Sequence, residues 1–248
     1  MGLNSGANDY LTKPFSKDEL FARISTSKEI RDLSSKQVEL NEEIKKTLTE
    51  KDVLLKEIHH RVKNSLSIVI GLLNLQMDSV DSGVKHKFQK SINRIHAISL
   101  VHEKLYESKT LSLIGIKDYI IDILRDIQLS FSMDNIDFNL HIEDIKFPIT
   151  IMIPFALLIT ELVINSVKYA TVEDQILKIG IKVKMIKDKV SFSYSDNGPG
   201  FPDDFNMENP TTLGFQIIQS LINQLYASID ITESEGVNLD IAFPFKGA

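Results

Sequence analysis

Residues 159–170 read ITELVINSVKYA, and three polar residues stand out in this apolar stretch. Glu161, Asn165 and Lys168 are spaced i, i+4 and i+7, so they share one face of a helix. Burying a carboxylate, an amide and an ammonium among Leu, Ile and Val is costly unless each has a partner. A phosphate with a hard cation would satisfy all three groups. The alternative is a solvent-facing polar stripe held by a Glu–Lys pair.

The next informative segment downstream is DNGPGF, residues 196–201, which directly follows an alternating strand. Asp196 at the strand end can accept hydrogen bonds from an amino group and a water. Gly198 and Gly200 allow the backbone to approach a ligand closely. The segment 202–210, which is rich in acidic residues, is expected to form a mobile lid.

A helix is predicted after this lid, from TTLGFQII at residues 211–218. Thr211 or Thr212 would be its N-cap, and Gly214 would lie in its first turn. The free amides at such an end can hold an anion.

Strands and helices interleave from residue 111 onward without regular βαβ units, which predicts an α+β sandwich with a mixed sheet. The predicted helices are near 116–131, 154–170 and 214–226, and the predicted strands are 136–144, 176–186, 189–196, 227–234 and 238–245.

The N-terminal part differs, because residues 16–76 contain no proline and Gly71 is their only glycine. This composition predicts one or two long helices. Apolar residues form one heptad seam from Ile30 to Ile44 and another from Leu48 to Val69, with Ile58 and Leu72 three residues after their partners on the second seam. The four-residue offset between them is a stutter in a parallel dimeric coiled coil, unless the heptads arise by chance. A turn at 77–85 and a second helix to about residue 107 predict a helical hairpin, and two hairpins would form a dimeric four-helix bundle.

Residues 57–66, EIHHRVKNSL, lie on this long helix. The heptad register places His59 on a partly packed row and His60 on an outward-facing row. The cations Lys56, Arg61 and Lys63 would favour a neutral, nucleophilic imidazole at His60. His102, on the apolar stripe of the second helix, is expected to be a core histidine.

Together these motifs resemble a known family. The order of an N-containing helix, a DxGxG turn, a lid and a glycine-led helix resembles the Bergerat (GHKL) ATP-binding fold of histidine kinases, gyrase, Hsp90 and MutL. EIHHRVKNSL, with RIHAISLVHEKLYES at residues 94–108, is similar to the dimerisation and phosphoacceptor domain of the HisKA_2 histidine kinases, which are close to the HWE kinases. The resemblance covers roughly residues 50–248.

The resemblance implies ATP and Mg²⁺ as cofactors. Its nucleotide-binding residues would be Asn165 on Mg²⁺, Lys168 near the phosphates, Asp196 on the adenine amino group, and the box glycines Gly198, Gly200 and Gly214. Val237 departs from the family, which often has Thr after the last glycine, and this puts a hydroxyl contact near adenine in doubt.

The resemblance also implies that His60 is the phosphoacceptor. Many histidine kinases carry a carboxylate base directly after the histidine, but here that residue is Arg61. Glu57 and Glu161 are the replacements, and the sequence does not choose between them. Asn64, four residues after His60, matches the position where related kinases hold a water for phosphatase action.

Residues 1–24 resemble the closing strand and helix of a response-regulator receiver, with Lys13 followed by Pro14. The alternative is an ordinary helical N-terminus. The predicted organisation is a receiver remnant at 1–24, a coiled-coil linker at 25–50, a dimerisation and phosphotransfer hairpin at 51–110, and an ATP-binding domain at 111–248.

Composition excludes several classes of protein. The chain has no cysteine, so disulfide scaffolds and thiolate zinc sites are excluded. Residues 1–110 carry 18 Lys and Arg against 15 Asp and Glu, whereas residues 111–248 carry 10 against 19, so neither part predicts nucleic-acid binding. No apolar run is long enough to predict a membrane span, and we expect a cytoplasmic protein.

The sequence therefore predicts a homodimeric sensor histidine kinase that phosphorylates His60 from Mg-ATP and passes the phosphoryl group to a response-regulator receiver. Two alternatives remain. One is a GHKL ATPase without histidine phosphorylation, and the other is a phosphotransfer scaffold with a degenerate ATP domain.

Overall fold

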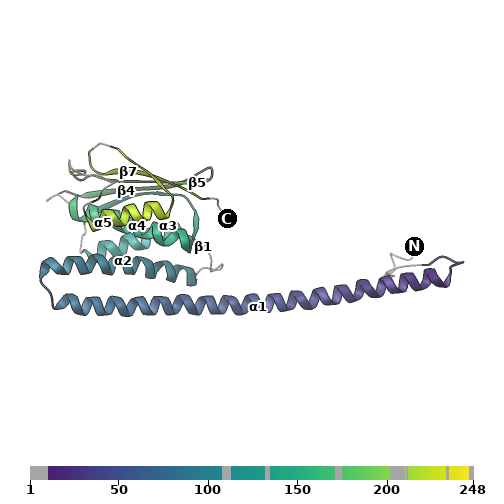
Figure 1. Ribbon diagram of the computed structural model, residues 1–248. Coiled ribbons are helices and arrows are strands. Elements are labelled where there is room, and N and C mark those ends of the chain that lie inside the picture. Colours follow the sequence, from purple (N-terminus) through teal and green to yellow (C-terminus); the bar gives the residue numbers. More distant parts are fainter. Residues whose placement is uncertain are drawn as a thin grey trace. The chain divides into compact units, whose positions relative to one another are not determined.

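The computed structural model describes residues 11–107, 113–131, 135–170, 175–201, 210, 212–232 and 235–245, without the side chains of Ser82 and His86. The chain divides into two compact units, Met1–Leu55 and Lys56–Ala248. Figure 1 labels the elements of both units.

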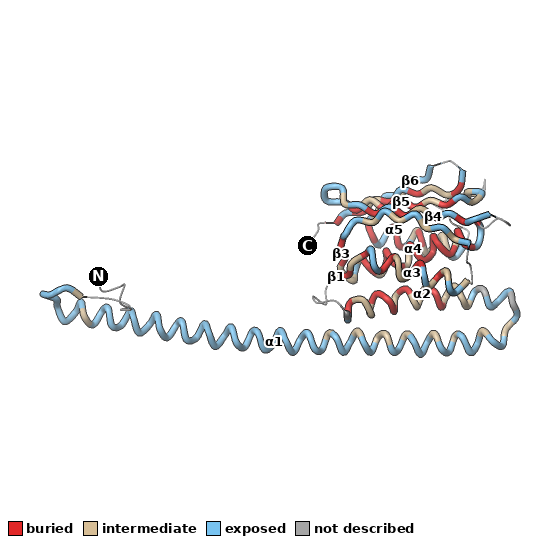
Figure 2. Tube along the Cα trace, turned by 180° about the vertical axis from the view of Figure 1, so that it is seen from behind, coloured by how far each residue is buried: buried red, intermediate tan, exposed pale blue. Residues whose placement is uncertain are grey.

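The first helix, α1, runs unbroken over Lys17–Asp78, as the lack of breakers predicts. It begins where Ser16 Oγ accepts a hydrogen bond from the Glu19 amide at 3.1 Å, which satisfies a free N–H of the first turn. No residue of α1 is buried. Figure 2 shows the exposed residues along its length. The strand expected for a receiver remnant falls largely on residues 1–10, which lie outside the described residues.

The second helix, α2, spans Ser82–Glu107 and forms the predicted hairpin with the C-terminal part of α1. The turn is shorter than the predicted 77–85, because the Asp81 carbonyl already accepts the Val84 and Lys85 amides at 2.9 and 3.0 Å. On its other side α2 packs against the C-terminal α/β domain, where Ala97 and Val101 are fully buried. The hairpin helix is therefore part of the core of the second unit.

The predicted mixed sheet is present, in the order β2-β4-β5-β7-β6. Its strands are β2 (Ile136–Ile142), β4 (Leu177–Ile186), β5 (Lys189–Asp196), β6 (Ser228–Ile231) and β7 (Asn238–Pro244). Only the β2–β4 pair is parallel. Along β5 every second residue is buried, so one sheet face lies against the core.

Three helices cover that face of the sheet (Figure 1): α3 (Ile116–Ser130), α4 (Ile149–Tyr169) and α5 (Leu213–Gln224). Edge-to-face aromatic rings fill the layer between them, with Phe155 contacting Phe192 of the sheet at 5.2 Å between centroids. The layered core fixes α4 between the sheet and α2, and α4 carries the ITELVINSVKYA segment.

The predicted start of α4 at Pro154 is wrong. The helix begins at Ile149, and Pro154 lies inside it. Proline removes one i→i−4 hydrogen bond, but the fully buried neighbours Met152 and Phe155 hold the turn in place. The length and hydropathy of α4 alone would suit a membrane span, but 67% of its most apolar 18-residue stretch is buried inside the protein.

The sequence patterns missed two strands. β1 (Leu113–Gly115) pairs antiparallel with β3 (Lys146–Pro148) in a separate two-stranded sheet. Each has three residues, too short for a hydrophobic alternation to be recognised.

Candidate functional site

Asp196, the last residue of β5, is a buried carboxylate that accepts three hydrogen bonds. The amides of Gly198 and Val237 donate to Oδ1 at 3.0 and 3.1 Å, and the Ser166 hydroxyl donates to Oδ2. Because the one Ser166 proton is used here, the Tyr194 hydroxyl must donate to Ser166 Oγ, 2.8 Å away. Burial raises the pKa of Tyr194, which keeps that donor neutral. The network leaves one lone pair of Oδ2 for a ligand.

Asp196 lies at the wall of a cavity of about 530 Å³. Its walls are mainly apolar and aromatic, from α4, the β5 end, the following loop and the start of α5. The lining residues are Leu162, Asn165, Ser166, Tyr169, Ala170, Tyr194, Asp196, Pro199, Gly200, Phe201, Thr212, Phe215 and Val237. An apolar cavity with one convergent carboxylate suits a flat heterocycle that carries an amino group.

The glycines of this loop allow the chain to pass close to α4 and β7. A Cβ atom on Gly198 would lie 2.3 Å from the Ala170 Cβ atom, which is not sterically possible. Gly200 has a φ of +83°, which side chains other than glycine rarely adopt. Gly200 lines the cavity, whereas Gly198 sets the distance between the loop and α4.

Glu161 is fully buried and bound to α2 rather than to Lys168. Both Glu161 carboxylate oxygens accept hydrogen bonds from the Arg94 guanidinium, one of them from Nη2 at 2.9 Å. The solvent-facing Glu–Lys stripe considered from the sequence is therefore wrong. The pair joins the hairpin to the ATP-binding domain.

Asn165 lines the cavity one turn further along α4, and its buried Nδ2 atom has no hydrogen-bond partner. An unpaired buried donor is costly, so the site fits an incoming acceptor such as a phosphate oxygen. The amide oxygen at the same position is a suitable ligand for Mg²⁺. Gly214 completes this corner, because a Cβ atom there would lie 3.5 Å from both Asn165 Oδ1 and Glu161 Oε2.

Lys168 is exposed at the rim of the cavity and does not line it. Its Nζ atom donates to the Tyr169 hydroxyl at 2.9 Å and lies 4.6 Å from the Tyr169 ring centroid. Thr212 is the N-cap of α5 as predicted, although its side chain makes no capping hydrogen bond. The expected lid falls mainly on residues 202–209, outside the described residues.

His60 is exposed on α1 and His59 is half-buried, as the heptad register predicts. Asn64 Nδ2 lies 3.3 Å from His60 Nδ1, and the Tyr106 ring centroid of α2 lies 6.0 Å from the imidazole centroid. Both contacts come from the hairpin itself. The imidazole therefore remains open to a group that arrives from solvent.

His59 and His102 form a pair beside this site, with their Nδ1 atoms 2.9 Å apart. One ring must donate and the other accept, so at least one is neutral. Burial lowers the pKa of both, and the charge of His59 lowers that of His102 further. His102 is thus half-buried and not fully in the core as expected, and its partner is the first histidine of the HHRVKN motif.

Two cations next to His60 carry carboxylate partners. Arg61 pairs with Glu57 at 2.6 Å, and Lys63 pairs with Glu103 of α2 at 2.5 Å. The hydrogen bond from Arg61 lowers the pKa of Glu57, and the charge of His60 contributes in the same direction. Each of these two cations is thus paired with an acidic side chain, one helical turn away or across the hairpin.

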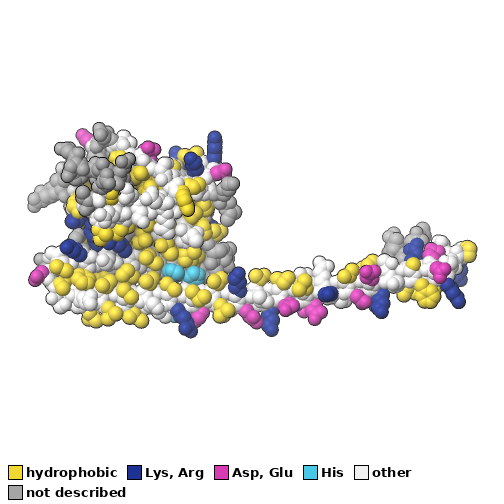
Figure 3. Space-filling model, viewed as in Figure 1, with side chains coloured by type: hydrophobic (Ala, Val, Ile, Leu, Met, Phe, Trp, Pro, Cys, Tyr) yellow, Lys and Arg dark blue, Asp and Glu magenta, His cyan; other side chains and the backbone are white. Residues whose placement is uncertain are grey.

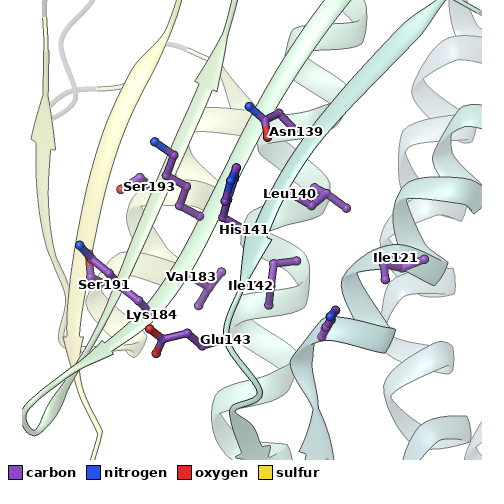
Figure 4. Close-up of a pocket in the computed structure, with 12 residues that line it drawn as sticks. Ile121, Asn139, Leu140, His141, Ile142, Glu143, Val183, Lys184, Ser191 and Ser193 are labelled. Carbon is purple, nitrogen blue, oxygen red and sulfur yellow. The ribbon is translucent and has the colours of Figure 1, made fainter.

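A larger groove of about 700 Å³ lies at the free edge of β2 (Figure 4). His141 and Leu140 both line it, although successive strand residues point to opposite faces of a sheet. The groove is therefore surface that wraps around the strand edge, and it lacks the enclosed walls of the cavity at Asp196.

Three contributors to the site were missed from the sequence: Ser166, Tyr194 and Arg94. A signal existed for Ser166, a buried polar residue next to Asn165 on an apolar helix. Arg94 gave none, because its partner Glu161 is 67 residues away in the chain.

Two family models match the chain. The histidine kinase model HisKA_2 covers residues 57–131, and the model for histidine kinase-, DNA gyrase B-, and HSP90-like ATPases covers residues 152–247. The first match contains the hairpin with His60, and the second contains the cavity at Asp196.

Two curated relatives are histidine kinases. The chain is 24% identical over 201 residues to blue-light-activated histidine kinase 2 of Erythrobacter litoralis, covering 78% of this chain and 58% of that protein. It is 30% identical over 183 residues to the sensor histidine kinase PdtaS of Mycolicibacterium smegmatis, covering 71% of this chain and 36% of that protein. The chain thus spans about a third to three fifths of the length of these relatives.

Among solved structures, the histidine kinase domain of the Erythrobacter litoralis EL346 blue-light activated histidine kinase has the same fold. The TM-score is 0.59 at 23% identity, covering 79% of this chain and 93% of that one. With the two family matches and these relatives, the hairpin and the cavity identify the chain as a member of the HWE-type sensor histidine kinases.

Proposed function

We propose that this protein is a cytoplasmic, homodimeric histidine kinase that transfers the γ-phosphoryl group of Mg-ATP to His60 and then to a receiver aspartate. The observation that supports it best is the presence in one chain of an exposed imidazole and an apolar cavity with a buried carboxylate. Each feature occurs alone in many proteins, but a phosphoacceptor and a nucleotide cavity together suit autophosphorylation.

In the proposed nucleotide complex, Asp196 accepts a hydrogen bond from the adenine amino group through its free lone pair. Tyr169 and Phe215 line the cavity and provide aromatic surface against the base. Asn165 would hold Mg²⁺, which neutralises the charge that develops on the phosphates. Backbone amides at the start of α5 would bind phosphate oxygens.

At the hairpin, the His60 Nε2 lone pair forms the new N–P bond while the bond from the γ-phosphorus to the bridging oxygen breaks and ADP leaves. Nε2 has that lone pair only when the ring proton is on Nδ1. The Asn64 side-chain amide lies beside Nδ1, with its Nδ2 atom 3.3 Å away. Because Nδ2 only donates, the amide would turn over to bring its carbonyl oxygen to Nδ1, where it would accept that proton. Asn64 would thereby orient the nucleophile.

Of the two candidate bases, Glu57 is the better placed. It lies on the same helix as His60, and the two groups interact electrostatically. Glu57 would stabilise the positive charge on the imidazole as the N–P bond forms. Both carboxylates are held by an arginine, Glu57 by Arg61 and Glu161 by Arg94, but Glu57 is exposed whereas Glu161 is fully buried.

Labelling with γ-labelled ATP tests the proposal. We expect an acid-labile, base-stable label on the wild-type protein, no label on His60→Gln, and full label on the exposed control His141→Gln. Equal labelling of wild type and His60→Gln would refute the assignment of His60. ATP hydrolysis without any label would instead favour a GHKL ATPase, and a label only from a phosphorylated receiver would favour the scaffold.

A further inference from the structure

A group of cations lies where α2 meets α4, outside the cavity that binds the base. Lys90 and Arg94 are four residues apart, so they share one face of α2. Lys90 Nζ lies 6.0 Å from the centroid of the Tyr169 ring, and Lys168 lies 4.6 Å from the same centroid. Arg94 binds Glu161 one turn further along.

The charge in this group does not balance. The charged side chains that act on Lys90 are Lys168, Arg94 and Glu161, which with Lys90 itself makes three cations and one carboxylate. Lys90 is half-buried, and no carboxylate in the described part of the chain pairs with it. Burial lowers its pKa, and the positive charges of Lys168 and Arg94 lower it further. Such desolvated positive charge is costly without an anion.

The same corner contains the features that suit phosphate. The Glu161 carboxylate held by Arg94 lies 3.5 Å from a Cβ position on Gly214, in the first turn of α5. The Asn165 Oδ1 atom lies at an equal distance from that position, and the unpaired Nδ2 atom lies at 3.7 Å. Arg94 therefore binds a carboxylate that borders the two elements that would hold a triphosphate, whereas Asp196 is placed for the base.

A triphosphate chelated to one Mg²⁺ keeps a net negative charge, which matches the excess positive charge of the group. The ATP-binding domain carries more acidic than basic residues, so cations from α2 would offset an unfavourable long-range field. An arginine guanidinium also donates bidentate hydrogen bonds to phosphate oxygens, as it does to carboxylate oxygens.

We propose that Lys90 and Arg94 of α2 complete the nucleotide site by binding the terminal phosphate of ATP, with Arg94 donating from Nη1 while its Nε and Nη2 atoms keep Glu161 paired. The inference rests on the proposed kinase function. It makes the phosphotransfer hairpin a sensor of the γ-phosphate, because both cations belong to the hairpin.

The test is calorimetric binding of Mg-ATP, Mg-ADP and adenosine to the full chain. Lys90→Gln should weaken Mg-ATP binding about 10-fold, weaken Mg-ADP binding less, and leave adenosine binding unchanged, as expected for one charge-assisted hydrogen bond. Lys87→Gln, which removes an exposed cation one turn away on α2, should match wild type for all three ligands.

Arg94→Gln alone would leave Glu161 buried and unpaired, so it is made together with Glu161→Gln. The double variant should bind Mg-ATP about 10-fold more weakly than Glu161→Gln alone and bind adenosine equally well. If Lys90→Gln matches Lys87→Gln, or weakens adenosine and Mg-ATP alike, this inference is wrong while the kinase function stands. If the wild-type protein binds no ATP, both are wrong.

Discussion

At the scale of single residues, Asp196 shows how a carboxylate can be buried and still serve a ligand. Three donors, the Ser166 hydroxyl and the amides of Gly198 and Val237, occupy fixed directions around it. The Val237 backbone makes this contact, so the network does not depend on the side chain at this position. Preorganised acceptors of this kind lose little entropy on binding.

Asp196→Asn should leave the protein folded but weaken ATP binding at least about 10-fold, since an amide presents a donor or a weaker acceptor to the adenine amino group. Calorimetric titration with ATP and with GTP measures the affinity for each nucleotide. Asp230→Asn, an exposed carboxylate on β6, is the matched control and should bind ATP as wild type does. Unchanged ATP affinity of Asp196→Asn would show that the base does not bind at this residue.

The His59–His102 pair predicts a pH dependence of stability. The folded state lowers the pKa of both rings, so the unfolded chain takes up protons first as the pH falls through about 6.5. Stability from the pair is therefore present above that pH and lost below it. The wild-type melting temperature should fall between pH 7.5 and 5.5, and His102→Gln should fall less because its side chain does not titrate.

Lys63 and Glu103 form an ion pair across the same two helices. His141→Gln, at an exposed histidine of the sheet, controls for histidine titration elsewhere and should keep the wild-type slope. Parallel curves for wild type and His102→Gln would contradict the assignment of the effect to this pair.

At the scale of elements, the loop after β5 and the end of α4 form the site only because they come very close together. The Asn197 side chain ties the loop to β4, with Oδ1 accepting the Lys178 amide at 2.7 Å and Nδ2 donating to the Ile176 carbonyl at 3.0 Å. Gly198 then passes the Ala170 cap of α4 without room for a side chain. The position of Asp196 relative to Asn165 thus depends on a backbone contact.

Gly198→Ala should cost about 1–3 kcal/mol of unfolding free energy and also reduce ATP affinity, because overpacking pushes the loop away from α4. Gly83→Ala in the first turn of α2 is the control, since its added methyl group meets nothing within 4 Å. Urea denaturation and ATP titration of both variants measure the two effects. A Gly198→Ala protein as stable as wild type would mean that the loop adjusts freely.

At the scale of the whole molecule, the hairpin leaves much apolar surface without a partner in a single chain. Ile58, Val69 and Leu72, all on the predicted second seam, are 54%, 42% and 57% exposed. Figure 3 shows apolar side chains gathered along the hairpin. A continuous exposed apolar surface of this kind is typical of an interface with a second protein chain.

We therefore expect the wild-type protein to be a dimer in light-scattering measurements, and Leu72→Glu to shift it toward the monomer by placing a charge in the bundle core. Leu129→Glu on α3, where the side chain is 71% exposed, is the matched control and should remain dimeric. A monomeric wild-type protein would rule out the four-helix bundle.

Much of this protein could be predicted from local patterns in its sequence. The breaker-free run gave the α1 helix, alternation gave the strands of the mixed sheet, and the heptad register distinguished exposed His60 from half-buried His59. The polar spacing on α4 and the DNGPGF turn identified Asn165 and Asp196 as site residues. These features depend on the 3.6-residue and 2-residue periods of helices and strands, which any single segment displays.

Only the tertiary structure placed α2 against the ATP-binding domain and gave Glu161 its partner Arg94. It also paired His59 with His102. At Asp196 it added the hydroxyl groups of Ser166 and Tyr194 to the hydrogen-bond network. It also showed that Arg61 and Lys63 are ion-paired, and that a helix can continue through Pro154 when its neighbours are buried. These contacts mostly join residues far apart in the chain. Their energies depend on the distance and burial that folding creates, and no local period records them.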